Sequence, residues 1–244
     1  MEEFYLACRA LYESAFGSES REFNEALFRF AYPRYLRVIR EGDKPVSMLF
    51  SIPYPIQIGG TLAKARYLYA VATDRAYRGK GLATQLIQQE IARGLPVFLR
   101  PSSASLFGFY QKAGLLPFSP TLTMEGEAES LPSLGIESLS PDGYLACREA
   151  FLKEPFAVPS ADFLSLGFLY GGAVCLEGEL ATLYERQGDM IYFKEWLGNR
   201  ELAPRVAASL GGARYRLRVS EREGEPFGVG ANLPQGLTFS IAID

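Results

Sequence analysis

The sequence predicts an α+β fold with a mixed α/β sheet, arranged as two domains in tandem. In each domain we expect a mostly antiparallel sheet with a central parallel pair of strands and flanking helices. Three observations predict this fold. Apolar residues recur at helical spacing in the first thirty residues and again after residue 140. Short apolar runs are separated by glycine-containing turns, and one strand–turn–helix stretch spans Tyr67–Arg93.

The first half begins with two amphipathic helices and continues with a hairpin. Phe4, Cys8 and Leu11 share one helical face, and Pro33 ends the second helix. A strand, helix and strand within roughly thirty residues predict a right-handed crossover in a parallel pairing. The expected strands and later helices occupy residues 35–39, 46–52, 65–73, 82–91, 97–99 and 105–112, with a closing strand near 122–124.

The second half repeats this order of elements. Ser140-Pro141-Asp142 predicts a helix start, and three strands follow at 173–176, 180–186 and 190–196. A helix near 202–210, a strand near 214–219 and a last strand near 237–243 complete the chain. We interpret the repeat as an internal duplication, although any α+β chain can be aligned this loosely. The predicted division is a first domain at 1–125, a linker at 126–136 and a second domain at 137–244.

Composition limits the classes of function. The chain has 244 residues and a net charge of −3, and its pI is near 5.3, which argues against nucleic acid or an anionic membrane as a partner. No run approaches the roughly 20 apolar residues of a membrane helix, and the start lacks a signal-peptide pattern. Cys8, Cys147 and Cys175 are widely spaced, which favours buried thiols in a reducing cytoplasm and no metal site.

The chain has no histidine. This absence excludes histidine-dependent hydrolases, most zinc enzymes and any imidazole general base. In an enzyme with this composition, protons move through tyrosines, carboxylates, a terminus or water.

The turn Arg78-Gly79-Lys80-Gly81-Leu82-Ala83 is the strongest candidate for a binding site. Its glycines expose the backbone amides of positions 79–84, and the following helix adds the partial positive charge of its N-terminus. Arg78 and Lys80 add formal charges. The turn lacks the Gly-Lys-Ser/Thr ending of a Walker loop, and two helices and a meander precede it, unlike a dinucleotide fingerprint.

This turn resembles the R/Q-x-x-G-x-G/A signature of the GNAT acetyltransferase superfamily. The likeness extends to the preceding strand end Val71-Ala72-Thr73. It also extends to the segment Ser105–Leu115, which is similar to the S-x-x-x-x-Y-x-x-x-G-F/L helix of that family. The three pieces cover about residues 1–125 in the correct order.

The resemblance implies acetyl-CoA as the donor substrate. Its pyrophosphate would lie on the amides of Gly79, Lys80, Gly81, Leu82, Ala83 and Thr84 beside Arg78. Its pantetheine arm would pair along Val71, Ala72 and Thr73. A backbone amide near Val71 would polarise the acetyl carbonyl, as an oxyanion stabiliser does.

Two further roles follow from the resemblance. Tyr110 occupies the position of the tyrosine that protonates the departing thiolate, a role that suits a phenol protonated at neutral pH. Its alternative is a core aromatic beside Phe107 and Phe109. Ser105 matches the position that contacts the cofactor arm, and its alternative is an ordinary helix cap.

The general base is left open. The candidates are Tyr69, an acidic residue of the N-terminal helices, a water chain and the terminal carboxylate of Asp244. The last comes from a similarity to tandem GNAT proteins of the enhanced-intracellular-survival type. Those relatives carry an additional sterol-carrier-like domain that this chain lacks.

The second half has no counterpart of the glycine signature. Leu197-Gly198-Asn199-Arg200-Glu201-Leu202 follows the strand that ends at Trp196, and it contains one glycine and no basic cradle. We therefore expect a degenerate GNAT-like domain that binds no CoA and walls the acceptor cleft or supports the first half. For Trp196 we favour core packing and for Glu195 a solvated strand edge, with lining of the cleft as the alternative.

The leading hypothesis is an N-acetyltransferase that moves acetyl from acetyl-CoA to a primary amine by direct attack. The acceptor is a small molecule or a peptide, without a metal, nucleic acid or membrane partner. The alternatives are a CoA- or acyl-CoA-binding protein without catalysis and a tRNA-dependent aminoacyl transferase of tandem GNAT type. The sequence identifies neither the acceptor nor the oligomeric state.

Overall fold

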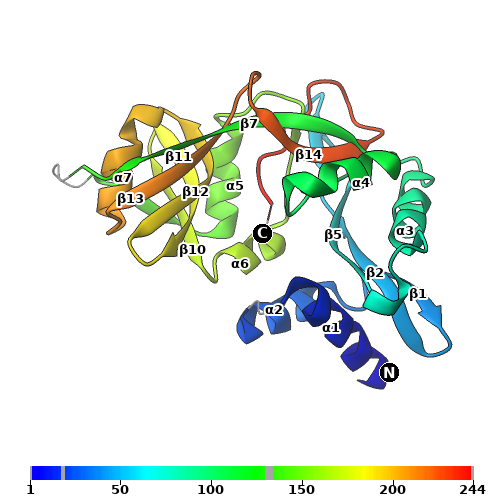
Figure 1. Cartoon of the computed structure of the whole chain (residues 1–244). Coiled ribbons are helices and arrows are strands. Elements are labelled where there is room, and N and C mark those ends of the chain that lie inside the picture. The colour runs from blue at the N-terminus through cyan, green and yellow to red at the C-terminus, as the bar shows by residue number, and fades with distance from the viewer. Residues whose placement is uncertain (1, 18–19, 130–133, 243–244) are drawn as a thin grey trace. The chain divides into compact units, whose positions relative to one another are not determined.

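The computed structural model describes residues 2–17, 20–129 and 134–242. Contacts divide the chain into two compact units, whose elements are labelled in Figure 1. Unit 1 contains Met1–Ile56, Leu62–Phe118 and Gly228–Gln235; unit 2 contains Gln57–Thr61, Ser119–Phe227 and Gly236–Asp244. Each unit therefore combines segments that are distant in sequence. The linear division into 1–125, 126–136 and 137–244 stays a prediction about domain organisation.

Unit 1 starts with two helices and continues with a sheet. Ser20 begins the second helix because its hydroxyl oxygen accepts a hydrogen bond from the Phe23 amide at 3.1 Å. The elements that lie wholly in this unit are α1 (Glu2–Phe16), α2 (Arg21–Ala31), β1 (Leu36–Glu41), β2 (Lys44–Pro53), β5 (Arg66–Thr73), η1 (Arg75–Tyr77), α3 (Leu82–Ile91), β6 (Val97–Leu99), η2 (Ala104–Leu106) and α4 (Phe107–Lys112). The short strands β3 (Ile56–Ile58) and β4 (Thr61–Ala63) and the strand β14 (Glu225–Ala231) belong to it in part.

Strand β2 lies at the centre of unit 1 and is covered on both faces. Phe50 packs edge-on against Phe28 of α2, with ring centroids 5.5 Å apart. The next residue, Ser51, donates a hydrogen bond to Glu90 of α3 at 2.5 Å. Successive strand residues point to opposite faces, so the helices must lie on opposite sides of the sheet. This arrangement explains why residues 45–52 are all buried.

The sheet of unit 1 is mixed. Strands β1, β2 and β5 are antiparallel neighbours, whereas β5 and β6 are parallel and joined through α3. Residues Val229, Gly230 and Ala231 of β14 pair antiparallel with β6 on its other side. The parallel pair at the centre was expected from the strand–helix–strand pattern. Strand β14 was not.

Unit 2 repeats the order of elements. Two helices precede an antiparallel meander, and a further helix connects two parallel strands, β12 and β13. The elements are β7 (Leu116–Glu127), β8 (Glu137–Leu139), α5 (Pro141–Glu149), β9 (Phe156–Ala157), α6 (Ala161–Gly167), β10 (Gly171–Leu176), β11 (Leu180–Gln187), β12 (Met190–Gly198), η3 (Arg200–Leu202), α7 (Ala203–Ser209) and β13 (Arg214–Ser220). The expected repeat in order is thus present. Its strands run β7-β13-β12-β11-β10-β8.

Two hydrophobic clusters cover the two faces of the unit 2 sheet. Leu180 and Trp196 belong to a cluster with Val206 of α7. Ala181, the neighbour of Leu180 in β11, belongs to a second cluster with Tyr144 of α5. In Figure 1, α5 and α6 accordingly lie on one side of this sheet and α7 on the other. Leu180 and Ala181 are consecutive in β11, so their side chains point to opposite faces of the sheet, and the two clusters lie on opposite faces.

The expected last strand at 237–243 is wrong for the described part of that range. Residues 237 and 239–242 are buried and Thr238 is half-buried, but the segment forms no strand; Thr238 makes only an isolated bridge with Phe156. Phe239 instead donates to and accepts from the hydroxyl of Ser119, at 2.8 and 2.7 Å. The apolar pattern at this end of the chain therefore reflects burial of an irregular segment.

The sequence does not predict strand β14, because the strand contains two glycines and a proline: Glu225-Pro226-Phe227-Gly228-Val229-Gly230-Ala231. Such residues are depleted in strands. Packing requires the second glycine: a Cβ on Gly230 would lie 2.8 Å from the carbonyl oxygen of Val97.

Among the described residues, no helix is long and apolar enough to cross a membrane.

Candidate functional site

The turn between β5 and α3 has an open, glycine-dependent backbone. Gly79 has φ +77° and Gly81 has φ +76°, a left-handed conformation that L-residues with a Cβ rarely adopt. A Cβ built on either glycine would meet no heavy atom within 4 Å, apart from immediate neighbours. The turn from Arg78 to Gly81 is also exposed to solvent. The sequence therefore creates a vacant backbone surface at this point.

The N-terminus of α3 adds hydrogen-bond donors to this surface. Gly81 is its N-cap and provides no side-chain acceptor, and the first amide that bonds within the helix is that of Gln85, to the Gly81 carbonyl at 2.9 Å. The amides of Leu82, Ala83 and Thr84 precede that bond, so the helix supplies no acceptor for them. Together with the helix dipole, these groups favour an anion.

Two cations flank the turn. Arg78 donates from Nε to the Thr73 carbonyl oxygen at 3.3 Å, which fixes it at the end of β5. The Lys80 ammonium lies 4.5 Å from the centroid of the Tyr77 ring. Both side chains are exposed, and their charges add to the partial charge of the amides. The arrangement suits a polyanion such as a pyrophosphate.

The base of the turn is held by an ion pair. Lys44 of β2 lies 2.6 Å from a carboxylate oxygen of Asp74, whose other oxygen accepts from the Ala76 amide at 2.9 Å. The hydrogen bond from Lys44, followed by that from Ala76, lowers the pKa of Asp74. The Asp74 carboxylate therefore stays charged and anchors η1 to the sheet.

Strand β5 is distorted where it approaches the turn. Its register against β2 shifts, so that Tyr69 pairs with Phe50 but Ala72 pairs with Met48. Ala70 and Val71 thus share one position opposite the partner strand, which is a β-bulge, and Ala70 has φ +55°. A bulge of this kind redirects the backbone groups of the residues that it contains.

Beyond its first residues β5 leaves its parallel neighbour. The pairing with β6 comprises Arg66 with Val97 and Tyr67 with Phe98, and β6 ends at Leu99 while β5 continues to Thr73. The strand segment that contains Val71, Ala72 and Thr73 therefore continues past the end of β6. This part of the strand can accept an extended ligand as an additional pairing partner.

Ser47 of β2 reinforces the end of β5. Its hydroxyl donates to the Ala72 carbonyl at 3.1 Å and lies 2.9 Å from the Thr73 hydroxyl. Ser47 is fully buried, so these bonds have no competition from water. Sequence reasoning missed both Ser47 and the left-handed Ala70. Both depend on how β2 and β5 pair residue by residue, and the sequence does not specify that register.

Tyr110 lies in α4 and is 7% exposed. Burial raises the pKa of its phenol to about 12, so the hydroxyl carries its proton throughout the neutral range. Its ring packs edge-on against Phe109 at 5.0 Å. Tyr110 therefore packs in the core and also keeps its phenolic proton at neutral pH. Core packing and a role as general acid are compatible.

Ser105 lies in the short η2 segment before α4 and is exposed. Its hydroxyl is 2.9 Å from that of Ser103. The N-cap of α4 is Leu106, without a side-chain hydrogen bond, so Ser105 is not the cap of that helix. Contact with a ligand arm stays a prediction for this residue.

The candidate bases are in different situations. The Tyr69 ring is stacked on Tyr67 with centroids 6.1 Å apart. In α1 and α2, Glu13 and Glu25 are paired with Arg9 and Arg21. Asp244 lies outside the described residues. The geometry thus assigns no base among them.

The corresponding turn of unit 2 is built differently. Asn199 caps η3 by accepting from the Glu201 amide at 3.0 Å, and Pro204 removes an amide from the start of α7. A Cβ on Gly198 would lie 2.1 Å from the Glu179 carbonyl oxygen, so backbone already fills the space beside that glycine. Arg200 pairs with Glu221 at 3.2 Å. This turn lacks the open amide surface of unit 1.

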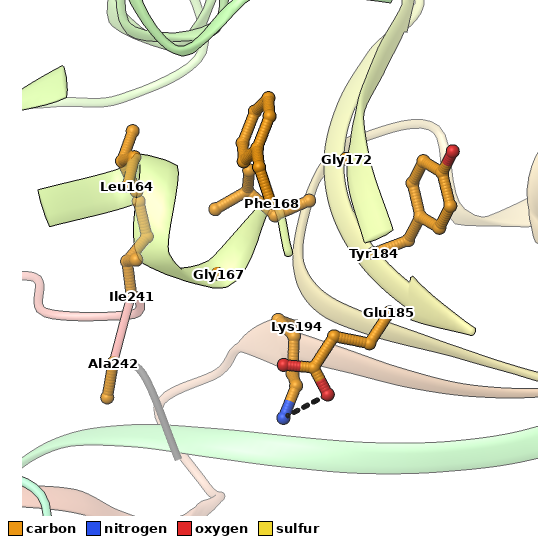
Figure 2. Close-up of a pocket in the computed structure, with 10 residues that line it drawn as sticks. Leu164, Gly167, Phe168, Gly172, Tyr184, Glu185, Lys194, Ile241 and Ala242 are labelled. Carbon is orange, nitrogen blue, oxygen red and sulfur yellow. Dashed lines mark ion pairs between the residues drawn. The ribbon is translucent and has the colours of Figure 1, made fainter. Parts of the chain in front are cut away.

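Unit 2 contains a hollow of its own, which we call the unit 2 hollow. It measures about 370 Å³, including open solvent, and lies between α6, the strands β10–β12 and the segment at Ile241–Ala242. Figure 2 shows Glu185 and Lys194 paired at its edge, and their nitrogen and oxygen are 3.0 Å apart. The sequence contained no motif for it.

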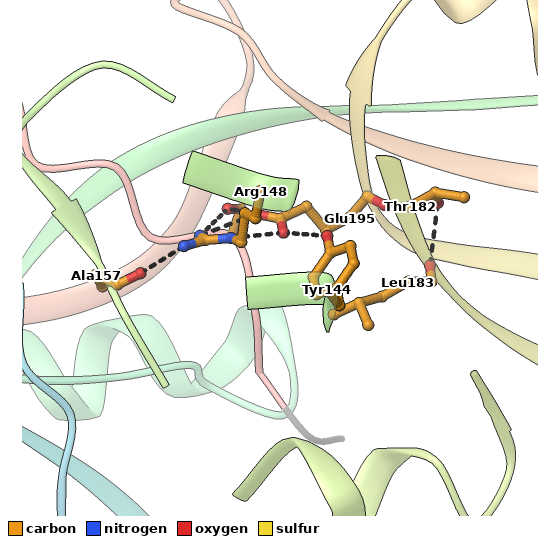
Figure 3. A network of polar contacts seen from close by, with 7 residues as sticks. Tyr144, Arg148, Ala157, Thr182, Leu183 and Glu195 are labelled. Carbon is orange, nitrogen blue, oxygen red and sulfur yellow. Dashed lines mark hydrogen bonds and ion pairs between the residues drawn. The ribbon is translucent and has the colours of Figure 1, made fainter. Parts of the chain in front are cut away.

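Glu195 and Trp196 lie in the interior of unit 2. Figure 3 shows Glu195 surrounded by Tyr144 and Arg148, and its 2% exposure contradicts the solvated edge favoured from the sequence. Leu183 pairs with Glu195 and Tyr184 with Phe193, so Lys194 forms a β-bulge, which lets Glu195 face α5. Trp196 is 3% exposed and packs against Phe193 with ring centroids 4.8 Å apart, which confirms core packing.

The described residues contain no group of three or more potential metal ligands. The site of unit 1 combines a bulged strand, a parallel neighbour that ends earlier and a glycine turn into a helix without a side-chain cap. Residues 1–115 match the family model described as an acetyltransferase (GNAT) domain. This match covers 115 of the 244 residues, so the chain carries an acyltransferase domain of GNAT type in its first half.

Solved structures resemble the chain over nearly its whole length. A GCN5-related N-acetyltransferase from Anabaena variabilis has a TM-score of 0.70 at 18% identity, over 94% of this chain and 70% of its own. A probable N-acyltransferase from Enterococcus faecalis has a TM-score of 0.68 at 15% identity, with the same coverage. Eis1 from Mycobacterium abscessus has a TM-score of 0.61 at 13% identity, over 92% and 64%. At these identities the likeness is one of fold. No curated protein matches the sequence significantly.

Proposed function

We propose that the protein is an N-acetyltransferase that transfers acetyl from acetyl-CoA to a primary amine by direct attack. The observation that carries the proposal is the turn from Gly79 to Thr84, where open amides, a helix N-terminus and two cations coincide. A pyrophosphate is the ligand that such a cradle binds. The match of residues 1–115 to an acetyltransferase family makes acetyl-CoA the substrate of choice.

The chain's own groups then have distinct tasks. The amides of Gly79–Thr84, with Arg78 and Lys80, hold the pyrophosphate, and Ser105 contacts the arm of the donor. Val71, Ala72 and Thr73 pair with the pantetheine arm along β5. The bulge directs the Val71 amide toward the acetyl carbonyl, where it stabilises the negative charge that develops during attack.

Tyr110 is the proposed general acid. The attacking amine displaces the thiolate of CoA, and a phenol that remains protonated donates its proton to the sulfur. The proton of the attacking amine leaves through Tyr69, an acidic residue of α1 or α2, water or the carboxylate of Asp244. The acceptor is a small-molecule or peptide amine.

Unit 2 is proposed to be a degenerate GNAT-like domain, so the chain forms a tandem with one donor site. Its capped and backbone-filled turn supports this view. The cytoplasm is the proposed site of the reaction, because the wide spacing of Cys8, Cys147 and Cys175 favours free thiols in a reducing compartment.

Isothermal titration with acetyl-CoA tests the donor site. Gly81→Glu adds a carboxylate to the cradle and should abolish or greatly weaken binding, while wild type binds one acetyl-CoA per chain. Gly178→Glu is a matched control, because Gly178 has φ +71° in an equally open turn of unit 2. It imposes the same backbone strain and charge, and should leave binding intact. Absence of binding to wild type refutes the proposal.

A CoA-binding protein without catalysis is the first alternative. It has the same affinity for acetyl-CoA but releases no thiol with any member of an amine panel, and Tyr110→Phe has no effect. A tRNA-dependent aminoacyl transferase is the second. The net charge of −3 disfavours it, and salt-dependent binding of tRNA would support it.

A further inference from the structure

The side chain of Tyr77 lies between a carboxylate and a cation of the glycine turn. Its hydroxyl donates a hydrogen bond to the carboxylate of Glu41, at the end of β1. Its ring meets the Lys80 ammonium, which lies 4.5 Å from the ring centroid. Tyr77 ends η1, so it stands two residues before Gly79, where the open backbone of the turn begins.

The hairpin of β1 and β2 holds the η1 segment in place. The Asp74 amide donates to the Val46 carbonyl oxygen at 2.9 Å, and the Asp74 carboxylate pairs with Lys44 at 2.6 Å. The bond from Tyr77 to Glu41 adds a third connection to the same hairpin. The Tyr77 ring is half-buried and tied at both ends of η1, so its position is defined before any ligand binds.

Lys80 is available to a ligand, whereas the neighbouring lysine is not. Lys44 lies 5.4 Å from the centroid of the Tyr77 ring, but its charge is already paired with Asp74. Among the described residues, Lys80 has no carboxylate partner, and its contact is the Tyr77 ring. The Lys80 side chain is also exposed, so its charge can reach an anion from solvent.

An aromatic ring restrains a lysine without neutralising it. A free lysine side chain loses much rotamer freedom when it binds, so prior restraint lowers the cost of binding. A carboxylate in the place of the ring would compete with a phosphate for the ammonium. The ring attracts the ammonium through its quadrupole, and an ammonium with three N–H donors still has donors for a phosphate.

Glu41 strengthens this restraint through the ring. A phenol that donates to a carboxylate is polarised, because charge-assisted hydrogen bonds shift electron density toward the donor's oxygen and ring. A more negative ring face attracts a cation more strongly. Glu41 thus acts on Lys80 without forming an ion pair with it.

We propose that Tyr77 is a positioning residue for the donor substrate. It holds Lys80 beside the glycine turn in the orientation in which the ammonium pairs with the pyrophosphate. Tyr77 acts through Lys80, and Glu41 acts through Tyr77. The inference rests on the proposed function, since the pyrophosphate is that of acetyl-CoA, and it goes further by giving Tyr77 and Glu41 tasks of their own.

Isothermal titration with acetyl-CoA provides the first test. Tyr77→Leu removes the ring and should weaken binding about tenfold, which corresponds to about 1.4 kcal/mol. Tyr77→Phe keeps the ring and loses only the bond to Glu41, so its loss should be about threefold or less. Tyr192→Leu is the matched control, because Tyr192 is a half-buried tyrosine of unit 2 whose ring centroid lies 5.6 Å from the Arg216 guanidinium. It should bind as wild type does.

A double-mutant cycle shows whether Tyr77 acts through Lys80. Lys80→Met keeps the apolar stem and removes the charge. Tyr77→Leu should then cause no further loss of acetyl-CoA binding in the Lys80→Met background. In steady-state assays, Tyr77→Leu should raise the KM for acetyl-CoA about tenfold and leave kcat unchanged, because the lost interaction contributes to ground state and transition state alike.

NMR of the free protein provides a readout that needs no ligand. Protons held over the face of an aromatic ring resonate upfield, so the methylene protons next to the Lys80 ammonium should be shifted upfield in wild type. Their signal is identified by its absence in Lys80→Met. The upfield shift should disappear in Tyr77→Leu and persist in Tyr77→Phe. Circular dichroism verifies the folding of each variant.

The wild-type titration separates this inference from the proposed function. If wild type does not bind acetyl-CoA, both are refuted. If it binds, the inference alone is overturned when Tyr77→Leu has no effect, when its effect is undiminished in Lys80→Met, or when Tyr77→Phe loses as much as Tyr77→Leu. A fall in kcat at unchanged KM overturns it as well. If Tyr77→Leu does not fold, the wild-type spectrum decides, and the absence of an upfield Lys80 signal overturns the inference.

Discussion

Arg148 of α5 and Glu195 of β12 form an ion pair inside unit 2, with Nε and Oε2 2.8 Å apart and each side chain 2% exposed. Figure 3 shows the contacts around them. Tyr144 donates to Glu195 at 2.5 Å, Ser240 also donates to it, and Arg148 donates to the Ala157 carbonyl at 2.9 Å. This network connects α5, β9, β12 and the segment around Ser240.

Removing one partner of this pair should destabilise the protein severely. Arg148→Met leaves the Glu195 carboxylate buried and uncompensated, and we expect a loss of about 3–5 kcal/mol in the free energy of unfolding. Urea unfolding measures it. The double variant Arg148→Met/Glu195→Leu should recover much of the loss. Arg214→Met, which breaks the exposed pair with Asp189, is the control and should change little. A small effect of Arg148→Met alone would contradict this account.

The same carboxylate should make stability depend on acidity. Burial by itself would raise the pKa of Glu195, but the charge of Arg148 and the hydrogen bonds from Arg148, Ser240 and Tyr144 lower it below its usual value of 4.5. A lowered folded-state pKa stabilises the fold above the unfolded-state pKa, and this contribution is lost as the pH falls through the folded-state value.

Wild type and Glu195→Gln should therefore differ most in unfolding free energy near neutral pH. The difference should shrink as the pH falls below about 4.5, where the unfolded state takes up the proton. Urea titrations across this range measure it. A difference that is constant with pH would show that Glu195 does not titrate with unfolding.

Tyr110→Phe should impair turnover and leave donor binding intact. The phenol is the proposed general acid, and such acids typically contribute about 10²-fold or more to the rate. We therefore expect kcat to fall by about 10²-fold. The KM for acetyl-CoA should change little. Thiol release with the most reactive amine of a panel measures both constants. Equal kcat in variant and wild type would make Tyr110 a core residue alone.

The pH profile provides an independent readout for Tyr110. Because burial raises its pKa to about 12, the wild-type rate should show no decline from its ionisation near pH 10, where ordinary phenols ionise. Stopped-flow thiol release across the alkaline range checks this. A decline near the ordinary phenol pKa that disappears in Tyr110→Phe would contradict the raised value.

The bulge at Ala70 predicts an unusual effect of glycine in a strand. Ala70 has φ +55°, so Ala70→Gly should relieve strain and raise the free energy of unfolding by about 1 kcal/mol. The control is Ala72→Gly in the same strand, which should lower it by about 0.5–1 kcal/mol. Thermal and urea unfolding distinguish the two signs. Destabilisation by both variants would show that Ala70 is not strained.

Much of the fold followed from local patterns. The helices near residues 4–15, 23–30 and 82–91 and the meander at 173–196 were predictable, because apolar periodicity and glycine turns specify them locally. Strand β14 was not, since two glycines and a proline conceal its pairing with β6. The strand expected at 237–243 is wrong for the described residues 237–242, because their apolar side chains are buried in an irregular segment and not in a sheet.

The sequence by itself determined the turn from Arg78 to Thr84, because glycines, cations and a helix start are local properties. Tertiary structure alone decided the bulge at Ala70, the raised pKa of Tyr110 and the pairing of Glu185 with Lys194. Each of these depends on strand register or on burial by residues far away in the chain. Register and burial arise only when distant segments pack, and a linear pattern carries no record of which segments meet.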